Sequence, residues 1–448
     1  MTAGDPGAGW AEEALGLLLG RVGETAEQVG DRFPLYADPV HGRWTTTGRG
    51  SWTGGFWAGL LRLRARHTGS RTDHARAIAA TARLASWIEA DTATRGLILW
   101  YGTALADEAE GAGAAMGATR ERAAVAFAEG DCGGEETGGG GPEGRGATYG
   151  RVTETAVADG CGGKGDGADE RRRGSHDEAA GAGGTVSLRL LRQRAADAVL
   201  AGFDPVLGLV PWGSALGGPR LRARADGVPG LVPLLATAGP EGRAAAAHLH
   251  RHLDLCLPPT AARRPVPAWH LDAAGGWTAE ADPAPGWTRG EAWLLLAVAD
   301  ALTCAAAADD PAVWRVGRLT DAAELLLHSC AFLTGPLVPP ADARRPEGPY
   351  DTSAAAIAAV ALLKLAQVPG TAAAWASACA ARAAAVLHRL ASPVHLTRPA
   401  GSLPAGMLLD GCYDARGGTA VRHELVWGDY FLALGLAALL DRVDLRRV

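Results

Sequence analysis

A short stretch from Trp287 to Trp293 combines residue types that can bind a sugar acid. It reads Trp-Thr-Arg-Gly-Glu-Ala-Trp, follows a loop rich in Pro, Asp and Gly, and opens a run of Leu, Ala and Val. Arg289 and Trp293 are four residues apart, so they share one face of the predicted helix. A guanidinium beside an indole suits a ligand that has a carboxylate and a flat apolar side. The structural alternative is a helix start with a packed Trp and a capping Arg.

Helix starts of this kind recur along the chain, near residues 55, 96, 227, 290, 352 and 428. Each follows an irregular segment and is rich in Gly, Asp, Arg or aromatic residues. Apart from one low-complexity stretch they are roughly 60 residues apart, about two helices and two loops per unit. No alternating pattern is long enough to predict a sheet core. The repeat predicts an all-α protein in which six helical hairpins close into an (α/α)6 barrel. An open helical solenoid is the alternative.

The length fits either two average domains or one large one, and the recurrence of helix starts along the chain favours one. The chain has 448 residues, of which 48% are hydrophobic, enough for a sizeable core. We therefore expect a single barrel domain over residues 1–448. Residues 129–184 differ from the rest, because they contain four successive glycines, an Arg triplet and few apolar side chains. This composition predicts a low-complexity, disordered insertion within the domain, with a lid as the functional alternative.

Charge and patterning exclude several classes of protein. The net charge of −6 gives no basic field for nucleic acid. No stretch is long and apolar enough to span a bilayer, and the first residues lack the basic and apolar regions of a signal peptide. The seven Cys are scattered, odd in number and without a CxxC pair. Reduced thiols fit this pattern, so we expect a cytoplasmic protein without a membrane partner.

The sequence contains no clear pattern for a metal site or a cofactor site. His248, His250 and His252 supply one pair at i,i+4 but no third ligand, so a solvated or capped helix end is the simpler interpretation. No glycine-rich phosphate loop lies between a strand and a helix. We therefore expect no metal site and no cofactor.

Six stretches together resemble the unsaturated glucuronyl hydrolases of glycoside hydrolase family 88 and the related rhamnogalacturonyl hydrolases. They cover nearly the whole chain except the insertion. They are Trp52–Gly59, Ala225–Gly227, Trp269–His270, Trp287–Trp293, Asp351–Ala356 and Trp427–Tyr430. The resemblance implies an (α/α)6 barrel. It also implies removal of the non-reducing-end Δ4,5-unsaturated uronic acid that polysaccharide lyases leave on oligosaccharides, the expected partner of this chain.

The resemblance implies that Asp226 is the general acid/base. In that family the corresponding Asp protonates C4 of the double bond and helps water add at C5. The reaction is therefore a hydration and not a displacement at the anomeric carbon. It needs a carboxyl that holds a proton near neutral pH, which partial burial beside aromatic rings favours. The structural alternative for Asp226 is an N-cap on the helix that follows.

By the same matching, other residues resemble the family's substrate contacts. His270, Arg289 and Trp293 correspond to substrate-binding positions, with Arg289 holding the carboxylate. Trp52 or Trp57 corresponds to the Trp that stacks on the sugar. The structural alternatives are a loop histidine satisfied by backbone for His270 and core packing for Trp57.

The chain also departs from the family pattern. The family's second Asp falls at Thr94, and Asp91, one turn earlier, is the nearest possible substitute. A Gln expected ahead of the Trp287 stretch falls at Ala279. Two further interpretations therefore remain. One is another enzyme on the same barrel, acting on a different sugar, with Asp91, Asp351 or His270 facing Asp226. The other is a non-catalytic carbohydrate-binding relative.

Overall fold

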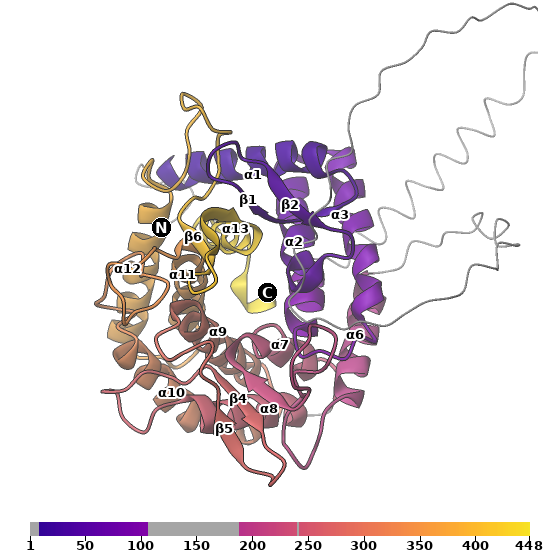
Figure 1. Ribbon diagram of the computed structural model, residues 1–448, viewed down its shortest axis with the longest axis vertical. Coiled ribbons are helices and arrows are strands. Elements are labelled where there is room, and N and C mark those ends of the chain that lie inside the picture. Colours follow the sequence, from indigo (N-terminus) through magenta and orange to yellow (C-terminus); the bar gives the residue numbers. More distant parts are fainter. Residues whose placement is uncertain (1–8, 106–187, 240–241) are drawn as a thin grey trace, which may run out of the picture. The chain divides into compact units, whose positions relative to one another are not determined.

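The computed structural model describes residues 9–105, 188–239 and 242–448, so the expected insertion at 129–184 lies outside the described residues. All helices and strands named below belong to one compact unit. Six segments that begin near the predicted helix starts form an inner set (Figure 1). They are α2 (Gly54–Thr68), the π-helical turn η4 (Gly96–Trp100) with α4 (Tyr101–Thr103), α7 (Leu231–Ala236), α9 (Thr288–Ala306), α11 (Thr352–Ala366) and α13 (Val426–Leu439).

The remaining helices form an outer set (Figure 1). They are α1 (Gly9–Val29), α3 (Arg71–Arg83) with the 3-10 turn η3 (Leu84–Trp87), α6 (Leu188–Ala201), α8 (Arg243–Cys256), α10 (Val316–Ser329) with η7 (Pro311–Trp314), and α12 (Ala373–Leu390). Each outer helix packs on inner ones: α3 on α2, α6 on α7, α8 on α7 and α9, and α10 on α9. In the same way, α12 packs on α11 and α13, and α1 packs on α13 and α2.

The inner segments contact one another in sequence order. α2 contacts η4 and α4, η4 contacts α7, α7 contacts α9, α9 contacts α11, and α11 contacts α13. α13 in turn contacts α2, so the inner set returns to its first member. The described part of the chain is predominantly helical, as the sequence predicted.

The first turns of the inner segments lie close together. A Cβ at Gly55 would be 2.3 Å from the Ile98 carbonyl oxygen, and one at Gly96 would be 2.2 Å from the Leu231 nitrogen, so only glycine permits these backbones to approach. The rings of Trp52, just before α2, and Trp427, in α13, have centroids 4.8 Å apart. The helix starts that the sequence singled out therefore gather at one end of the inner set.

Burial distinguishes the two sets of helices. In α11 every residue from Thr352 to Leu365 is buried, in keeping with its run of Ala, Val and Leu. An inner helix that is apolar all round is expected to be covered on all sides. Outer helices bury one face only. In α12 the buried residues recur at intervals of three or four, at Cys379, Ala383, Val386, Leu387 and Leu390.

A buried ion pair joins segments from the two ends of the described chain. Arg21 on α1 binds Glu424, with 2.8 Å between Nη2 and Oε2 and 3.1 Å between Nε and Oε1. The side chains are 4% and 0% exposed and lie 403 residues apart in sequence. Nη2 also donates to the carbonyl of Gly42 at 2.9 Å. This bidentate pair helps to hold α1 beside α13.

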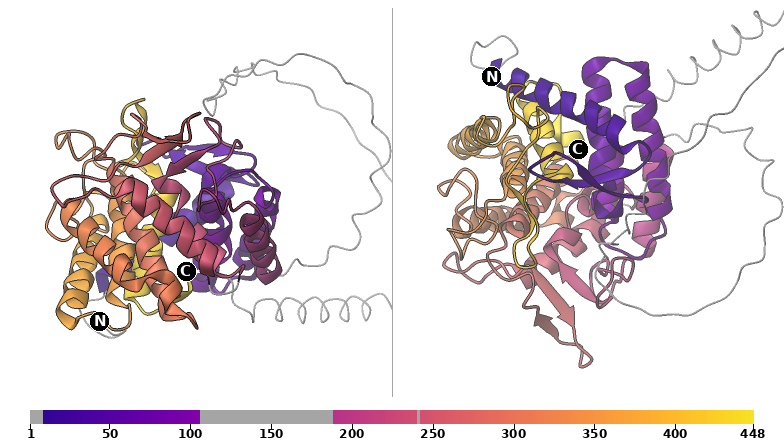
Figure 2. Two further views of the ribbon diagram at one scale, coloured as in Figure 1. Left: turned by 90° about the horizontal axis from the view of Figure 1, so that it is seen from below. Right: turned by 45° about the horizontal axis from the view of Figure 1, so that its top comes forward.

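Two small antiparallel sheets lie near the helix starts. One has the order β2-β1-β7-β6 and the other β3-β4-β5. The strands are β1 (Phe33–Ala37), β2 (Trp44–Thr47), β3 (Arg222–Arg224), β4 (Ala268–Leu271), β5 (Trp277–Ala279), β6 (Gly411–Asp414) and β7 (Thr419–Leu425). β7 ends directly before α13, and Figure 2 (left) shows β4 and β5 at one end of the helices. The sequence did not predict these strands, because all except β7 have only three to five residues and are too short to show a clear alternating pattern.

Two findings bear on the expected class of protein. Within the described ranges, no helix combines the length and the apolarity needed to cross a bilayer. Five cysteines of these ranges have free thiols, at positions 256, 304, 330, 379 and 412.

Candidate active site

Asp226 lies on the 3-10 turn η5 (Ala225–Gly227), between β3 and α7. Its two carboxylate oxygens accept hydrogen bonds from Arg224, at 3.0 Å from Nε and 3.2 Å from Nη2. The two side chains are 19% and 20% exposed, so the pair is partly open to solvent. Asp226 does not cap the following helix, since the N-cap of α7 is Gly230. The structural alternative for Asp226, an N-cap, is therefore contradicted.

Arg224 lies between an aromatic ring and two carboxylates. Its guanidinium carbon is 4.7 Å from the ring centroid of Trp212, a cation–π distance. Burial alone would lower the pKa of Arg224, but Asp226 and, more weakly, Glu280 raise it above its ordinary value. Glu280 therefore belongs to the same group of charges as Asp226.

The sheet β3-β4-β5 aligns further polar residues beside this pair. Arg222 is opposite His270, and His270 is opposite Thr278, so the three share a face. Glu280 follows β5, with its Oε1 2.5 Å from Nε of Arg222 and 3.7 Å from Nδ1 of His270. Its side chain is only 9% exposed, whereas that of His270 is 37% exposed. His270 thus lies beside a carboxylate. The structural alternative had predicted a loop histidine whose hydrogen bonds go to the backbone.

Sequence reasoning missed Glu280 as a site residue. A signal for it was present, because the family's Gln was aligned with Ala279, one position earlier. The short strand β5 fixes which residue of this loop faces His270, and that register cannot be read from a loop alignment.

Two buried histidines lie beneath the Asp226 turn. His248 accepts a hydrogen bond from the Val210 amide at Nδ1 (3.1 Å), so its Nε2 carries the proton and donates to the Gly227 carbonyl (3.3 Å). Nδ1 of His252 donates to the His248 carbonyl at 2.8 Å. Burial lowers the pKa of His252 to about 4 and that of His248 well below its ordinary value. The expectation of a solvated helix end is wrong for both, which are 1% and 0% exposed.

The neutral His248 therefore packs under the turn η5 and binds its last carbonyl, and His252 binds the carbonyl of His248. Neutral imidazoles are also potential metal ligands. In the part of the chain that the structure describes, no three His, Cys, Asp or Glu side chains are grouped so that they could hold a metal ion.

The guanidinium of Arg289 binds residues from other parts of the chain. Its Nη1 is 2.7 Å from Asp351 Oδ2 and also donates to the carbonyl of Cys412, while Nη2 donates to the Tyr413 carbonyl at 2.7 Å. Its guanidinium lies 5.2 Å from the Trp287 ring and 5.5 Å from that of Trp427. Arg289 is 4% exposed, so both its charge and its donors are used internally. This arrangement does not fit the predicted role of holding a substrate carboxylate.

Both carboxylate oxygens of Asp351 also accept hydrogen bonds from within the protein. One oxygen accepts from the amides of Ser353, Ala354 and Cys412 and from the Ser353 hydroxyl, and the other accepts from Arg289. Asp351 is fully buried, at 0% exposed. It therefore caps α11 and is not a second carboxylate facing Asp226.

The predicted aromatic contacts divide into two groups. Trp52 is half-buried, and its Nε1 donates to the Tyr413 hydroxyl at 3.3 Å. Together with Tyr413 and Trp287, which are also half-buried, it forms an aromatic cluster around Arg289 that can stack on a sugar. Trp57 and Trp293 are buried, at 3% and 1% exposed.

The burial of Trp293 corrects its predicted role as a substrate contact. Its ring packs on Phe56 at 6.2 Å and on Phe431 at 5.4 Å. An inner helix is covered on every side, so the face that Trp293 shares with Arg289 is directed into the core. For Trp57, core packing was the structural alternative, and its burial agrees with it.

Neither candidate for the missing Asp faces Asp226 with a free carboxyl. Thr94 is 2% exposed, with its hydroxyl 2.9 Å from that of Thr92. Asp91 is 42% exposed and binds Arg220 Nε at 3.0 Å and the Ser214 amide at 3.1 Å. Burial raises the pKa of Asp91, but the hydrogen bonds from Arg220 and Ser214 together outweigh it, so the pKa is lowered overall. Asp91 is thus held as a carboxylate in a surface network.

The Asp226 pair and the aromatic cluster are linked through the fold. The turn η5 contacts α9, whose first turn carries Arg289. Both groups therefore belong to the end of the inner set where the helix starts gather. We call this end the candidate active site.

Solved structures with a similar fold are unsaturated glucuronyl hydrolases. The enzyme from Bacillus sp. GL1, described as responsible for the degradation of glycosaminoglycan, is 20% identical, with a TM-score of 0.66 over 96% of this chain and 96% of that chain. The enzyme from Streptococcus agalactiae is 15% identical, with a TM-score of 0.65 over 98% and 94%. One specific for heparin is 16% identical, with a TM-score of 0.66 over 97% and 99%. No protein-family profile and no curated protein sequence matches the chain. At these identities the likeness establishes a shared fold.

Proposed function

We propose that this chain is a glycoside hydrolase on an (α/α)6 barrel that removes a Δ4,5-unsaturated uronic acid from the non-reducing end of oligosaccharides. The observation that carries the proposal is the half-buried Asp226 carboxylate, which caps no helix and faces an arginine beside an indole ring. The return of α13 to α2 supports six inner segments in a closed barrel. The shared fold with unsaturated glucuronyl hydrolases supports the substrate class.

In this proposal Asp226 acts first as an acid and then as a base. The protonated carboxyl gives its proton to C4 of the substrate, and a water oxygen bonds to C5. The proton lost by that water returns to the Asp226 carboxylate. The C5 hemiketal then opens, which leaves a hemiacetal at C1 that collapses and releases the remaining sugar. Proton transfer by one positioned carboxyl serves both steps.

Arg224, and not Arg289, binds the uronate carboxylate in this proposal. Arg289 is 4% exposed and already donates to three acceptors, whereas Arg224 is 20% exposed and donates its hydrogen bonds to Asp226. A bidentate guanidinium can exchange one carboxylate for another without a change in geometry. When the substrate takes Arg224, Asp226 loses the cation that stabilises its charge, which favours the proton required in the first step.

Glu280 takes the place of the second family carboxylate in this proposal. Thr94 cannot ionise, and Asp91 is bound to Arg220. Glu280 is the carboxylate beside His270 on the sheet face that adjoins Asp226. Together, Glu280 and His270 would orient the attacking water, while Trp52 supplies a stacking surface for the sugar.

The test is an ultraviolet assay with unsaturated disaccharides released by several polysaccharide lyases. Loss of absorbance at the conjugated double bond reports hydration. We expect decay with the native protein and a decrease of about 10²-fold or more with Asp226→Asn. Asp91→Asn is the matched control, because it changes a carboxylate in the surface network, and its rate should equal the native rate. Equal rates for native protein and Asp226→Asn would contradict the proposal.

A second candidate function is favoured by Thr94, which removes one carboxylate of the family pattern. In that case the chain binds unsaturated uronyl sugars without turning them over. Saturable binding of the disaccharides, without decay on any of them, would favour this carbohydrate-binding function. Decay on a saturated glycoside alone would favour another enzyme on the same barrel.

A further inference from the structure

A buried group of three ionisable side chains joins α1, β7 and α13. They are Arg21, Glu424 and Asp429, which are 4%, 0% and 3% exposed. Arg21 binds Glu424 through Nε and Nη2, and Asp429 is close enough for its charge to favour the charged form of Arg21. The group therefore brings two carboxyls to one guanidinium, and we call it the α1 cluster.

The carboxyl of Asp429 lacks the partners that a buried negative charge needs. Its Oδ1 has no hydrogen-bond partner among the residues that the structure describes. A buried carboxylate without full hydrogen bonding is so costly that the group usually takes up a proton instead. Burial raises the pKa of Asp429, and the charge of Glu424 raises it further, by more than Arg21 and the Leu408 amide lower it.

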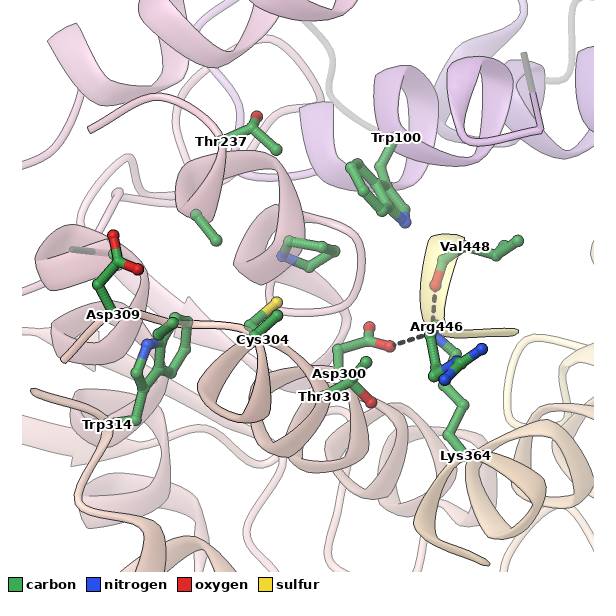
Figure 3. A pocket seen from close by; sticks show the side chains of 15 residues that line it. Trp100, Thr237, Asp300, Thr303, Cys304, Asp309, Trp314, Lys364, Arg446 and Val448 are labelled. Carbon is green, nitrogen blue, oxygen red and sulfur yellow. Dashed lines mark hydrogen bonds and ion pairs between the residues drawn. The ribbon is translucent and has the colours of Figure 1, made fainter. Parts of the chain in front are cut away.

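The charges of the α1 cluster balance only when one proton is bound. Two carboxylates and one guanidinium would leave a net negative charge where water does not reach, and one proton removes it. A different buried pair shows the contrast. Asp300 Oδ1 is 2.6 Å from Lys364 Nζ, beside a pocket of about 320 Å³ (Figure 3). That pair has one acid for one base, so its charges cancel without an added proton.

The charges that act on Asp429 come from α1 and β7. Glu24, three residues after Arg21 on α1, acts on Arg21 and on Glu424. Ionisable side chains of the other elements that pack on α13 have partners elsewhere. Lys364 of α11 binds Asp300, Arg64 of α2 binds Asp73, Arg66 of α2 donates to the Leu105 carbonyl, Arg382 of α12 donates to the Phe332 carbonyl, and Tyr36 of β1 packs on His423.

We propose that the α1 cluster takes up one proton when α1 packs on α13, which makes this junction sensitive to pH. Unfolded Asp and Glu side chains have pKa values of about 4, so near neutral pH the folded state binds one proton more than the unfolded state. The contribution of the cluster to stability is therefore greatest below about pH 4 and decreases as the pH rises. The decrease is up to about tenfold in the folding equilibrium constant per pH unit, until the folded cluster itself ionises.

The junction adjoins the candidate active site. Trp427 lies between Glu424 and Asp429 in the chain, and its ring centroid is 4.8 Å from that of Trp52. Loss of the proton at high pH should therefore loosen the packing behind the aromatic cluster. The proposal does not depend on the proposed function, because it concerns the stability of the free protein.

The test is urea denaturation of the full chain from about pH 6.5 to about pH 8, between the ordinary pKa values of histidine and cysteine. Asp429→Asn has the shape of the neutral carboxyl but no proton to lose. We expect the ratio of its folding equilibrium constant to the native one to rise about tenfold per pH unit. Glu424→Gln should give the same slope, since one carboxylate then remains for one cation, and it keeps the test valid if Asp429→Asn does not fold.

Glu13→Gln is the matched control, because it removes a carboxylate of α1 that is 66% exposed. Its ratio to the native protein should not change with pH. A purely structural effect of Asp429→Asn would likewise be the same at every pH, so the slope separates proton binding from packing.

Infrared spectra detect the proton directly. A protonated carboxyl has a carbonyl stretch at higher frequency than the amide band, which an ionised carboxylate lacks. We expect the native protein at neutral pH to show one such band that is lost in Asp429→Asn and in Glu424→Gln. Two results would overturn the proposal. One is a folding ratio that stays constant over the pH range for both variants, and the other is the absence of this band from both difference spectra.

Discussion

Arg224 and Asp226 form a bidentate ion pair although only one residue separates them in sequence, and the guanidinium of Arg224 also lies over Trp212. The strand β3 ends at Arg224 and the turn η5 begins at the next residue, so the change of backbone direction brings the two side chains together. In the part of the chain that the structure describes, the hydrogen bonds to the Asp226 carboxylate come from Arg224, and the guanidinium also lies over the Trp212 indole. An anionic ligand can therefore displace Asp226 without unfolding the turn.

Replacement of Arg224 tests its proposed contact with the uronate carboxylate. We expect Arg224→Lys to raise KM for an unsaturated disaccharide about tenfold or more, because Lys lacks the bidentate geometry. For a disaccharide whose uronate carboxylate is esterified, the same variant should cause a much smaller loss of binding, since that ligand offers no negative charge. Steady-state kinetics and calorimetric titration measure both effects. Equal losses for the acid and the ester would assign Arg224 a purely structural role.

Replacement of Glu280 tests whether it supplies the second carboxylate. We expect Glu280→Gln to lower kcat about 10- to 100-fold with little change in KM, because a water-orienting group acts after the substrate has bound. Asp282→Asn is a suitable control, since its carboxylate is in the same loop but is 69% exposed. A native kcat in Glu280→Gln would remove this residue from the chemistry.

The Arg289–Asp351 pair should contribute to stability more than to substrate binding. Arg289→Ala leaves a fully buried carboxylate without its cation, so we expect the free energy of unfolding to fall by about 3–5 kcal/mol. Urea denaturation measures this change. Arg344→Ala breaks an ion pair in which the arginine is 51% exposed and should cost less than about 1 kcal/mol. If Arg289→Ala instead kept native stability and lost only affinity, the substrate-binding role predicted from the sequence would be restored.

His252 should make the stability depend on pH. Its pKa is about 4 in the folded protein, whereas an unfolded histidine titrates near 6.5. Between these values the unfolded state binds more protons, so the free energy of unfolding falls as the pH drops from about 6.5 to about 4, by about 3 kcal/mol in total. Above pH 6.5 the contribution of His252 to the free energy of unfolding no longer changes with pH.

Urea denaturation from pH 4 to pH 8 measures that dependence. His252→Phe keeps a ring beside His248 but cannot be protonated, so the difference between the native and variant curves isolates the contribution of His252. A difference that does not change with pH would show that His252 has the same pKa in the folded and unfolded states, as a solvated ring would.

The helical pattern could be predicted because it is periodic over many residues. Runs rich in Ala and Leu predicted the helices, and the recurrent starts with Gly and Trp distinguished the inner ones. Segments rich in Gly and Pro predicted the loops between them. The position of α7 was less accurate, since the start predicted near residue 227 is followed by Val228, Pro229 and Gly230 before the helix begins at Leu231. Gly230, the N-cap of α7, has a positive φ of 69°, so the chain changes direction there and the helix begins one residue later.

The site was harder to predict, for a different physical reason. Spacing shows that Arg289 and Trp293 share a helix face, but in a helix buried on every side it does not show what that face meets. The partners of Arg289 come from Asp351 and Cys412, 62 and 123 residues away. Glu280 was missed because only the pairing of β4 with β5 brings it to His270. Asp226 was predicted from the resemblance to a known family and not from its local sequence, which by itself suits an N-cap.

The pair between Arg21 and Glu424 has a consequence for the order of folding. Contacts between residues 403 positions apart form only after the intervening chain has been organised, and such contacts slow folding. During synthesis on the ribosome, α1 emerges first but its buried arginine has no carboxylate until residue 424 has left the exit tunnel. Until then Arg21 and the inner face of α2 are exposed to solvent and to other chains. The Arg21 pair, and with it the contact of α1 with α13, can therefore form only when the last inner helix is available.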